Sequence, residues 1–235
     1  MSPDGRRIPF TVESSALQRC GTLYVNMLNA DTVTFREFMT QEPLPLSTIQ
    51  NAVLEFLRGR HDVVLFGAQA VNAYVAEPRM SEDIDLMTTR PEELARELRD
   101  WLSQRFRIAV RARTVGKSRG YRLFQIRKGG NRHLVDIRLA AALPRSKRIA
   151  QVQVIAPAEL IASKVLAYHR RRGQPKSGTD WRDLAMLLLA FPDLKRTPGL
   201  VSDALRAMGA DQRTLAKWQS LVAQEIRAED EDAEF

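Results

Sequence analysis

Cysteine is almost missing from this chain: Cys20 is the only one among 235 residues. A single thiol cannot form a disulfide within the chain or build a cysteine-rich zinc site, and it is typical of a reducing compartment. The three histidines, His61, His133 and His169, have no metal-ligand spacing. The sequence also lacks a P-loop, a dinucleotide fingerprint and a Gly-x-Ser-x-Gly elbow, which argues against the enzyme classes that depend on these motifs.

Long apolar runs are missing as well. The longest strongly apolar stretch, Leu184 to Phe191, is far too short to cross a bilayer. The segment from Met1 to Arg7 is polar, and no apolar region typical of a signal peptide follows it. We therefore expect a cytoplasmic protein that has no membrane partner.

Negative charge is scarce except at the C-terminus. The formal net charge is +8, and residues 229–234 alone contribute five acids, so the rest of the chain carries +13. A body this basic favours a polyanionic partner, because binding a polyanion releases its counterions. We therefore expect contact with nucleic acid and interpret the acidic tail as a solvated end.

Hydrophobic periodicity predicts mixed helix and strand up to about residue 155. Residues 1–45 have no clear pattern, and Thr32 to Phe38 is compatible with strand or helix. The next predicted elements are a helix capped by Ser47, a strand over 63–66, a helix from Gly67 to Pro78, a strand over 83–87, a helix from Pro91, and strands over 108–114, 121–127, 133–139 and 152–155.

After residue 155 the pattern becomes purely helical. Helices are predicted to begin at Pro157, at Asp180 and near 199 and 211, with a basic linker from Arg170 to Gly178. The sequence thus predicts an α+β fold, with a mixed-sheet core over 46–155 and a helical module over 156–235 that ends in the acidic tail.

Asp83 and Asp85 are the most informative residues. On a strand they point to the same face, roughly 6.5 Å apart along the strand. Ile84 and Leu86 are apolar and point to the other face, which indicates a strand of a core sheet. Two carboxylates on one face repel each other unless a cation lies between them, and hard divalent cations prefer such oxygen ligands. The pair therefore predicts a metal site.

Two further features accompany the pair. Asp136 is a lone acid in another apolar strand; if that strand lies beside the first, three carboxylates converge on a two-metal site. The turn Gly67-Ala68-Gln69 opens a helix, so the N–H groups of Ala68 and Gln69 are expected to face phosphates. Arg79 is expected to pair either with a phosphate or with an aspartate.

The helical part offers further candidates for binding anions. Lys164 lies mid-helix among apolar residues, where a lysine either extends to solvent or binds an anion. Asp180 is compatible with a helix N-cap. The basic residues Arg170, Arg171, Arg172 and Lys176 are expected to grip a triphosphate or an RNA backbone, or to form a solvated surface.

Together these residues resemble a known family. Gly67, the run Arg79-x-Ser81-x-Asp83-x-Asp85 and the later Asp136 are similar to the motifs of the polymerase-β-like nucleotidyltransferase superfamily. The helical continuation resembles the AbiEii / MenT-type branch, which comprises toxins of bacterial toxin–antitoxin and phage-defence systems. In that branch a helix-borne lysine precedes a basic element and an Asp-x-x-Asp, which Lys164 and Asp180-Trp181-Arg182-Asp183 match. The resemblance covers roughly residues 60–190.

The resemblance implies a Mg²⁺-dependent enzyme that moves a nucleotidyl group from an NTP. Asp83 and Asp85 would be metal ligands, Asp136 a ligand or general base, Lys164 a triphosphate ligand, and Asp180 part of the catalytic set. The implied acceptor is the 3′ end of tRNA or another RNA, and the implied protein partner is a cognate antitoxin.

Two alternatives stay open at this point. In the first alternative, the enzyme transfers the nucleotidyl group to a small molecule or to a protein hydroxyl, although a small acceptor would not need so basic a body. Alternatively, the chain is an inactive relative that only binds nucleic acid, because Ala68 stands where the family turn usually has serine or glycine, and Thr179 stands where a basic residue usually precedes the last motif.

Overall fold

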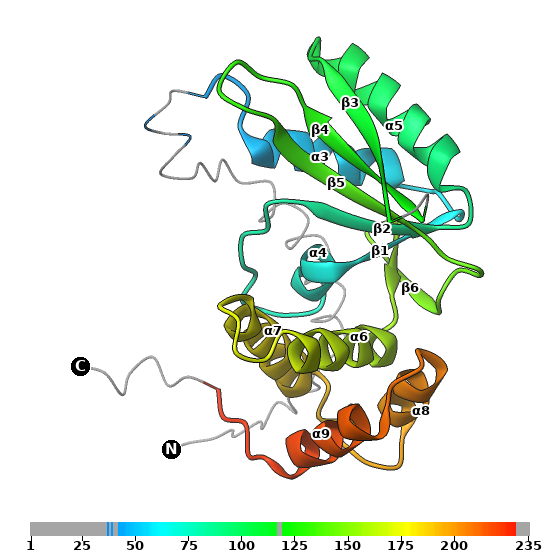
Figure 1. Ribbon diagram of the computed structural model, residues 1–235, viewed down its shortest axis with the longest axis vertical. Coiled ribbons are helices and arrows are strands. Elements are labelled where there is room, and N and C mark those ends of the chain that lie inside the picture. Colours follow the sequence, from blue (N-terminus) through cyan, green and yellow to red (C-terminus); the bar gives the residue numbers. More distant parts are fainter. Residues whose placement is uncertain (1–36, 38, 40–41, 117–118, 229–235) are drawn as a thin grey trace, which may run out of the picture.

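A seven-stranded mixed sheet forms the upper part of the protein in Figure 1, and a group of helices lies beneath it. The computed structural model describes residues 37, 39, 42–116 and 119–228. The strand order is β3-β4-β5-β2-β1-β7-β6. The strands are β1 (Val63–Phe66), β2 (Ile84–Thr88), β3 (Val110–Val115), β4 (Gly120–Gln125), β5 (Arg132–Leu139), β6 (Ser146–Ile149) and β7 (Val152–Ile155).

The helices divide between the sheet and the C-terminal part of the chain. The first group is α3 (Leu46–Leu57), α4 (Gly67–Asn72) and α5 (Pro91–Phe106). The second is α6 (Pro157–Arg170), α7 (Lys176–Ala190), the 3₁₀ turn η1 (Pro192–Leu194), α8 (Leu200–Ala207) and α9 (Gln212–Ala223). The predicted α+β fold, a mixed sheet followed by helices, is confirmed.

The order of the strands places the acidic residues. β1 and β2 run antiparallel, while β2 and β5 are parallel neighbours, with Asp85 opposite Asp136. Along β2, Ile84 and Leu86 are fully buried, so Asp85 points to the other face. The alternation seen in the sequence therefore corresponds to the two faces of this strand.

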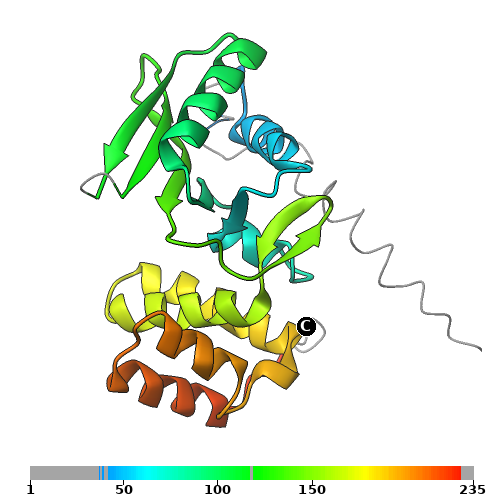
Figure 2. The ribbon, with the colours of Figure 1, turned by 90° about the vertical axis from the view of Figure 1, so that its right-hand side faces the viewer.

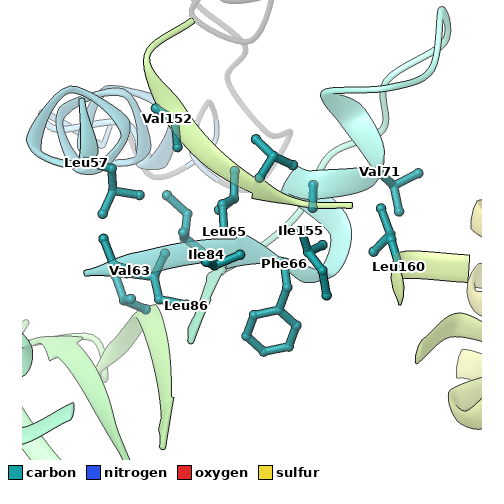
Figure 3. Packing of buried hydrophobic residues seen from close by; sticks show 14 of the residues in the cluster. Leu57, Val63, Leu65, Phe66, Val71, Ile84, Leu86, Val152, Ile155 and Leu160 are labelled. Atoms are coloured by element: carbon teal, nitrogen blue, oxygen red, sulfur yellow. The ribbon is translucent and has the colours of Figure 1, made fainter. Parts of the chain in front are cut away.

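The core fills the space between the sheet and its helices. In Figure 3, Leu57 of α3 approaches Val63 of β1, and Leu160 of α6 lies near Val71 of α4. All four residues of β1 are buried, as expected for a strand with a neighbour on each side and helices over it. The carboxylates thus project from a rigid sheet.

Several predicted element boundaries are wrong. α3 begins at Leu46, so Ser47 lies inside the helix and does not cap it. α7 begins at Lys176, about one turn before Asp180, so Asp180 is not an N-cap. The short, charged β6 was not predicted. The ambiguous segment 32–38 lies outside the described residues except for Glu37.

The helix predicted to run from Gly67 to Pro78 ends at Asn72. The Asn72 side chain accepts a hydrogen bond from the Arg79 N–H (3.0 Å) and donates one to the Arg79 carbonyl (2.8 Å). This fully buried amide holds the loop that precedes β2. Within the described part of the chain, no helix is long and apolar enough to span a membrane.

We expect Asn72→Ala to lower the free energy of unfolding by about 1–3 kcal/mol, because it leaves the Arg79 backbone groups without their partners. Urea unfolding monitored by circular dichroism measures this loss. Asn131→Ala, at an exposed turn, is the matched control and should change stability by less than about 0.5 kcal/mol. An equal effect of both variants would contradict the role assigned to Asn72.

Candidate functional site

Three carboxylates converge on one face of the sheet. Asp85 of β2 lies opposite Asp136 of β5, and Asp83 lies one residue before β2. His133 lies between two of them: its Nδ1 is 3.3 Å from Asp83 Oδ2, and its Nε2 is 3.2 Å from Asp136 Oδ1. Ligand atoms of Asp83, His133 and Asp136 all lie within 4.8 Å of one another. This donor set is compact enough to hold a metal ion.

A β-bulge explains how His133 reaches this face. Leu123 of β4 pairs with Val135, but the next residue, Phe124, pairs with His133, so Leu134 is an extra residue on β5. Without the bulge, His133 and Asp136 would point to opposite faces. Leu134 is instead buried, and His133 turns toward the carboxylates.

Basic residues surround the carboxylates. Arg122 of β4 donates to both oxygens of Asp136, at 2.7 and 3.4 Å. Arg138 lies 3.4 Å from Asp85 and stacks over the Phe66 ring, 4.7 Å from its centroid. These guanidinium groups balance part of the negative charge of the site.

The electrostatics of the aspartates differ. Burial raises the pKa of Asp85 to about 6, and the negative charges of Asp83 and Asp136 act in the same direction. Burial opposes ionisation of Asp136 too, but the hydrogen bonds from His133 and Arg122 outweigh it and lower its pKa. The hydrogen bond to Asp136 raises the pKa of His133. The site is therefore a crowded set of carboxylates partly neutralised by neighbouring cations.

Gly67 packs directly against Asp85. Its φ of +72° is in the left-handed region, and a Cβ added there would lie 1.9 Å from Asp85 Oδ2 and 2.9 Å from Asp85 Cβ. Only glycine fits this close approach between the start of α4 and β2. The structure thus places the predicted turn beside the carboxylates, with Ala68 and Gln69 following in α4; their contact with phosphate stays a prediction.

A second charged cluster faces the carboxylates from the helices. Asp183 of α7 is fully buried. It accepts from Lys164 Nζ (2.6 Å) and from two nitrogens of Arg79 (2.6 and 2.7 Å). Burial alone would raise the pKa of Asp183, but these two cations outweigh it and lower the pKa. The positive charge of Lys164 opposes part of the rise in the pKa of Asp85, as expected for two clusters that lie near each other.

The other predicted residues lie around the α6–α7 turn. Asp180 is buried and accepts two hydrogen bonds from Arg171, at 3.0 and 2.9 Å, whereas Asp183 is the acid that pairs with Lys164. Arg170, Arg172 and Lys176 are exposed. The structure therefore unites Asp83, Asp85, Asp136 and Gly67 in one place, and joins Lys164 and Arg79 through Asp183.

Four residues of these clusters were not predicted to be part of the site: His133, Asp183, Arg122 and Arg138. His133 gives no signal in the sequence beyond its position three residues before Asp136, because its direction depends on the bulge. Asp183 is visible as the second acid of Asp-x-x-Asp, but the sequence alone does not show which of the two acids faces Lys164.

The sequence model of the nucleotidyl transferase AbiEii toxin family, of a type IV toxin–antitoxin system, matches residues 52–235. The chain belongs to this family. The match includes all three carboxylates, Gly67 and the Asp183 cluster, and it confirms the expected nucleotidyltransferase class. No curated protein matches the chain.

Three solved structures are similar to this chain at low sequence identity, and the first of them has a TM-score above 0.5. The Megavirus polyadenylate synthase is 13% identical with a TM-score of 0.55; the match covers 82% of this chain and 40% of that chain, so this chain spans two fifths of that enzyme. JHP933 from Helicobacter pylori is 16% identical with a TM-score of 0.48, and the match covers 81% of this chain and 92% of that chain. ANT(2")-Ia, solved with adenylyl-2"-tobramycin, is 13% identical with a TM-score of 0.44, and the match covers 75% of this chain and 100% of that chain.

We expect Gly67→Ala to destabilise the AbiEii-family fold more than Gly59→Ala. Both positions have a left-handed φ, which costs an alanine about 1–2 kcal/mol. Only at Gly67 does the new Cβ also collide with Asp85, which adds about 1–3 kcal/mol of overpacking. Urea unfolding of the two variants measures the difference, and equal losses would contradict the close approach described above.

We expect Asp183→Asn to cost roughly 3–5 kcal/mol of unfolding free energy, because it leaves the buried Lys164 ammonium without a counter-charge. Asp180→Asn should lower the free energy of unfolding by less, because the Arg171 side chain is 37% exposed and water can hydrate its charge. Denaturant unfolding compares the two. A larger loss at Asp180 would show that the central ion cluster is not the one around Asp183.

Proposed function

We propose that the chain transfers a nucleotidyl group from an NTP to an acceptor hydroxyl, and that the acceptor is the 3′ end of tRNA. The observation that carries this proposal is the convergence of Asp83, Asp85 and Asp136 opposite a cluster of Lys164 and Arg79. The family match and the basic charge of the body support it.

The negative and positive clusters have complementary tasks in this reaction. Asp83, Asp85 and Asp136 would hold Mg²⁺. The fit rests on the ligand atoms of Asp83, His133 and Asp136, which lie within 4.8 Å of one another, and on Asp85, which pairs with Asp136 across β2 and β5. Bound there, Mg²⁺ would supply positive charge to the triphosphate oxygens and to the reacting hydroxyl. Lys164 and Arg79, fixed by Asp183, attract the triphosphate from the helical side.

The reaction is an in-line displacement. The acceptor oxygen attacks the α-phosphorus, a new O–P bond forms, and the bond from the α-phosphorus to the bridging oxygen breaks, so that pyrophosphate leaves. The hydroxyl proton passes to a carboxylate oxygen of Asp136. The protein contributes mainly by fixing the reacting groups and neutralising their charge. Because the family is part of a toxin–antitoxin system, we propose that a cognate antitoxin opposes this activity.

Incubation with α-labelled NTPs, Mg²⁺ and total tRNA tests the proposal. We expect wild type to move label onto RNA, and Asp83→Asn to reduce the rate at least about 100-fold, because it removes a charge that binds the metal. Glu82→Gln, next to it and exposed, is the matched control and should keep the rate.

The destination of the label separates the alternatives. Label on a protein or a small molecule would correct the acceptor but keep the reaction. No label transferred by wild type to any acceptor would show that the chain is not an active nucleotidyltransferase under these conditions, whatever its fold.

A further inference from the structure

Among the residues that the structure describes, helices cover one face of the β3–β4–β5 end of the sheet and leave the other face open. α3 and α5 lie on the same side of these strands in Figure 2, where α5 packs on all three. Val110 and Ala112 of β3 pack against the core on that side. The alternate residues Arg111 and Arg113 point the other way and are exposed. The open face is the one that carries the carboxylates.

The strand register connects this open face to the site in two rows. Arg113 of β3 pairs with Arg122 of β4, which pairs with Asp136 of β5, which in turn pairs with Asp85 of β2. In the second row, Arg111 pairs with Phe124, which pairs with His133. Since neighbouring strands are about 4.8 Å apart, the outer arginines lie only about 10 Å from the carboxylate row.

The charges on this face are not balanced. Arg113 and Arg122 lie directly opposite each other, and like charges in that position destabilise a sheet. Asp136 neutralises Arg122 in part, but among the described residues Arg111 and Arg113 have no ion-pair partner. A bound polyanion would relieve this repulsion, which gives the two outer arginines a function.

An aromatic ring lies among these arginines. Phe124 is part of the second row, between Arg111 and His133, and its ring centroid is 5.2 Å from that of His133. It is partly exposed, and within the described part of the chain it is not packed against the core cluster, unlike Tyr121 of the same strand. Cations around an accessible ring form the surface on which single-stranded nucleic acids stack their bases.

We propose that the face formed by Arg111, Arg113, Arg122 and Phe124, hereafter the acceptor face, binds the single-stranded 3′ end of the RNA acceptor. The arginines contact its phosphates, a base near the end stacks on Phe124, and the terminal hydroxyl reaches Asp136. This inference rests on the proposed function for its substrate, but it places the acceptor on the sheet rather than on the α6–α7 turn.

Binding without catalysis tests the arginines. A labelled single-stranded RNA is titrated with nucleotide-free protein in EDTA, and its anisotropy is followed over a series of salt concentrations. Arg111→Gln combined with Arg113→Gln should weaken binding at least about 10-fold. It should also make the slope of log K against log salt shallower by about 1.4, the value for two lost phosphate contacts on a single strand.

The matched control is Arg96→Gln combined with Arg99→Gln on α5, which removes the same charge from a different element. It should leave the affinity within about 2-fold. Equal weakening by both double variants would mean that only net charge matters, and it would overturn the acceptor face.

The aromatic contact is tested separately. Phe124→Leu keeps an apolar side chain but removes the ring, and should weaken RNA binding by about 5-fold or more. Phe124→Trp should bind at least as tightly as wild type. If leucine and tryptophan behave alike, no base stacks at this position.

Four outcomes separate this inference from the proposed function. Label transfer that is unchanged in the Arg111/Arg113 variant overturns the acceptor face and keeps the reaction. If RNA binding is lost only when Arg170 and Arg172 are changed, the acceptor binds at the α6–α7 turn and the inference is wrong. The inference is also wrong if the protein does not bind RNA at all. RNA binding through the acceptor face without label transfer by wild type supports the inference and contradicts the proposed reaction.

Discussion

The parallel pairing of β2 with β5 is the constraint on which the site depends. It brings Asp85 opposite Asp136, two residues that are 51 positions apart in the sequence, and it fixes both on one face of a sheet whose other face is core. The cost is a concentration of negative charge in a buried place: burial, followed by the charges of Asp83 and Asp136, raises the pKa of Asp85. Nearby arginines reduce this charge, and the proposed metal would reduce it further.

The helices complete the site through one buried carboxylate. Asp183 holds Lys164 of α6 and Arg79 of the loop before β2 in a single cluster, so these ion pairs join the helices to the loop that leads into β2. Asn72 fixes the loop that carries Arg79, and Gly67 permits α4 to start against Asp85. Stability and the proposed chemistry thus depend on the same few residues.

Much of this arrangement was predictable from local pattern. Alternation identified the strands that carry Asp85 and Asp136, and Pro91 and Pro157 marked the starts of two helices. The rest depends on contacts that no local pattern contains. The bulge at Leu134 turns His133 toward the site. The Asn72 amide binds the backbone of Arg79 just after the early end of α4, and the packing of α7 on α6 places Asp183 rather than Asp180 against Lys164.

A crystal structure with Mg²⁺ and a non-hydrolysable NTP analogue tests the central claim most directly. The account predicts metal density among the oxygens of Asp83, Asp85 and Asp136, with the triphosphate extending from there toward the Lys164 and Arg79 cluster. A nucleotide bound elsewhere, or metal density away from these three carboxylates, would contradict it.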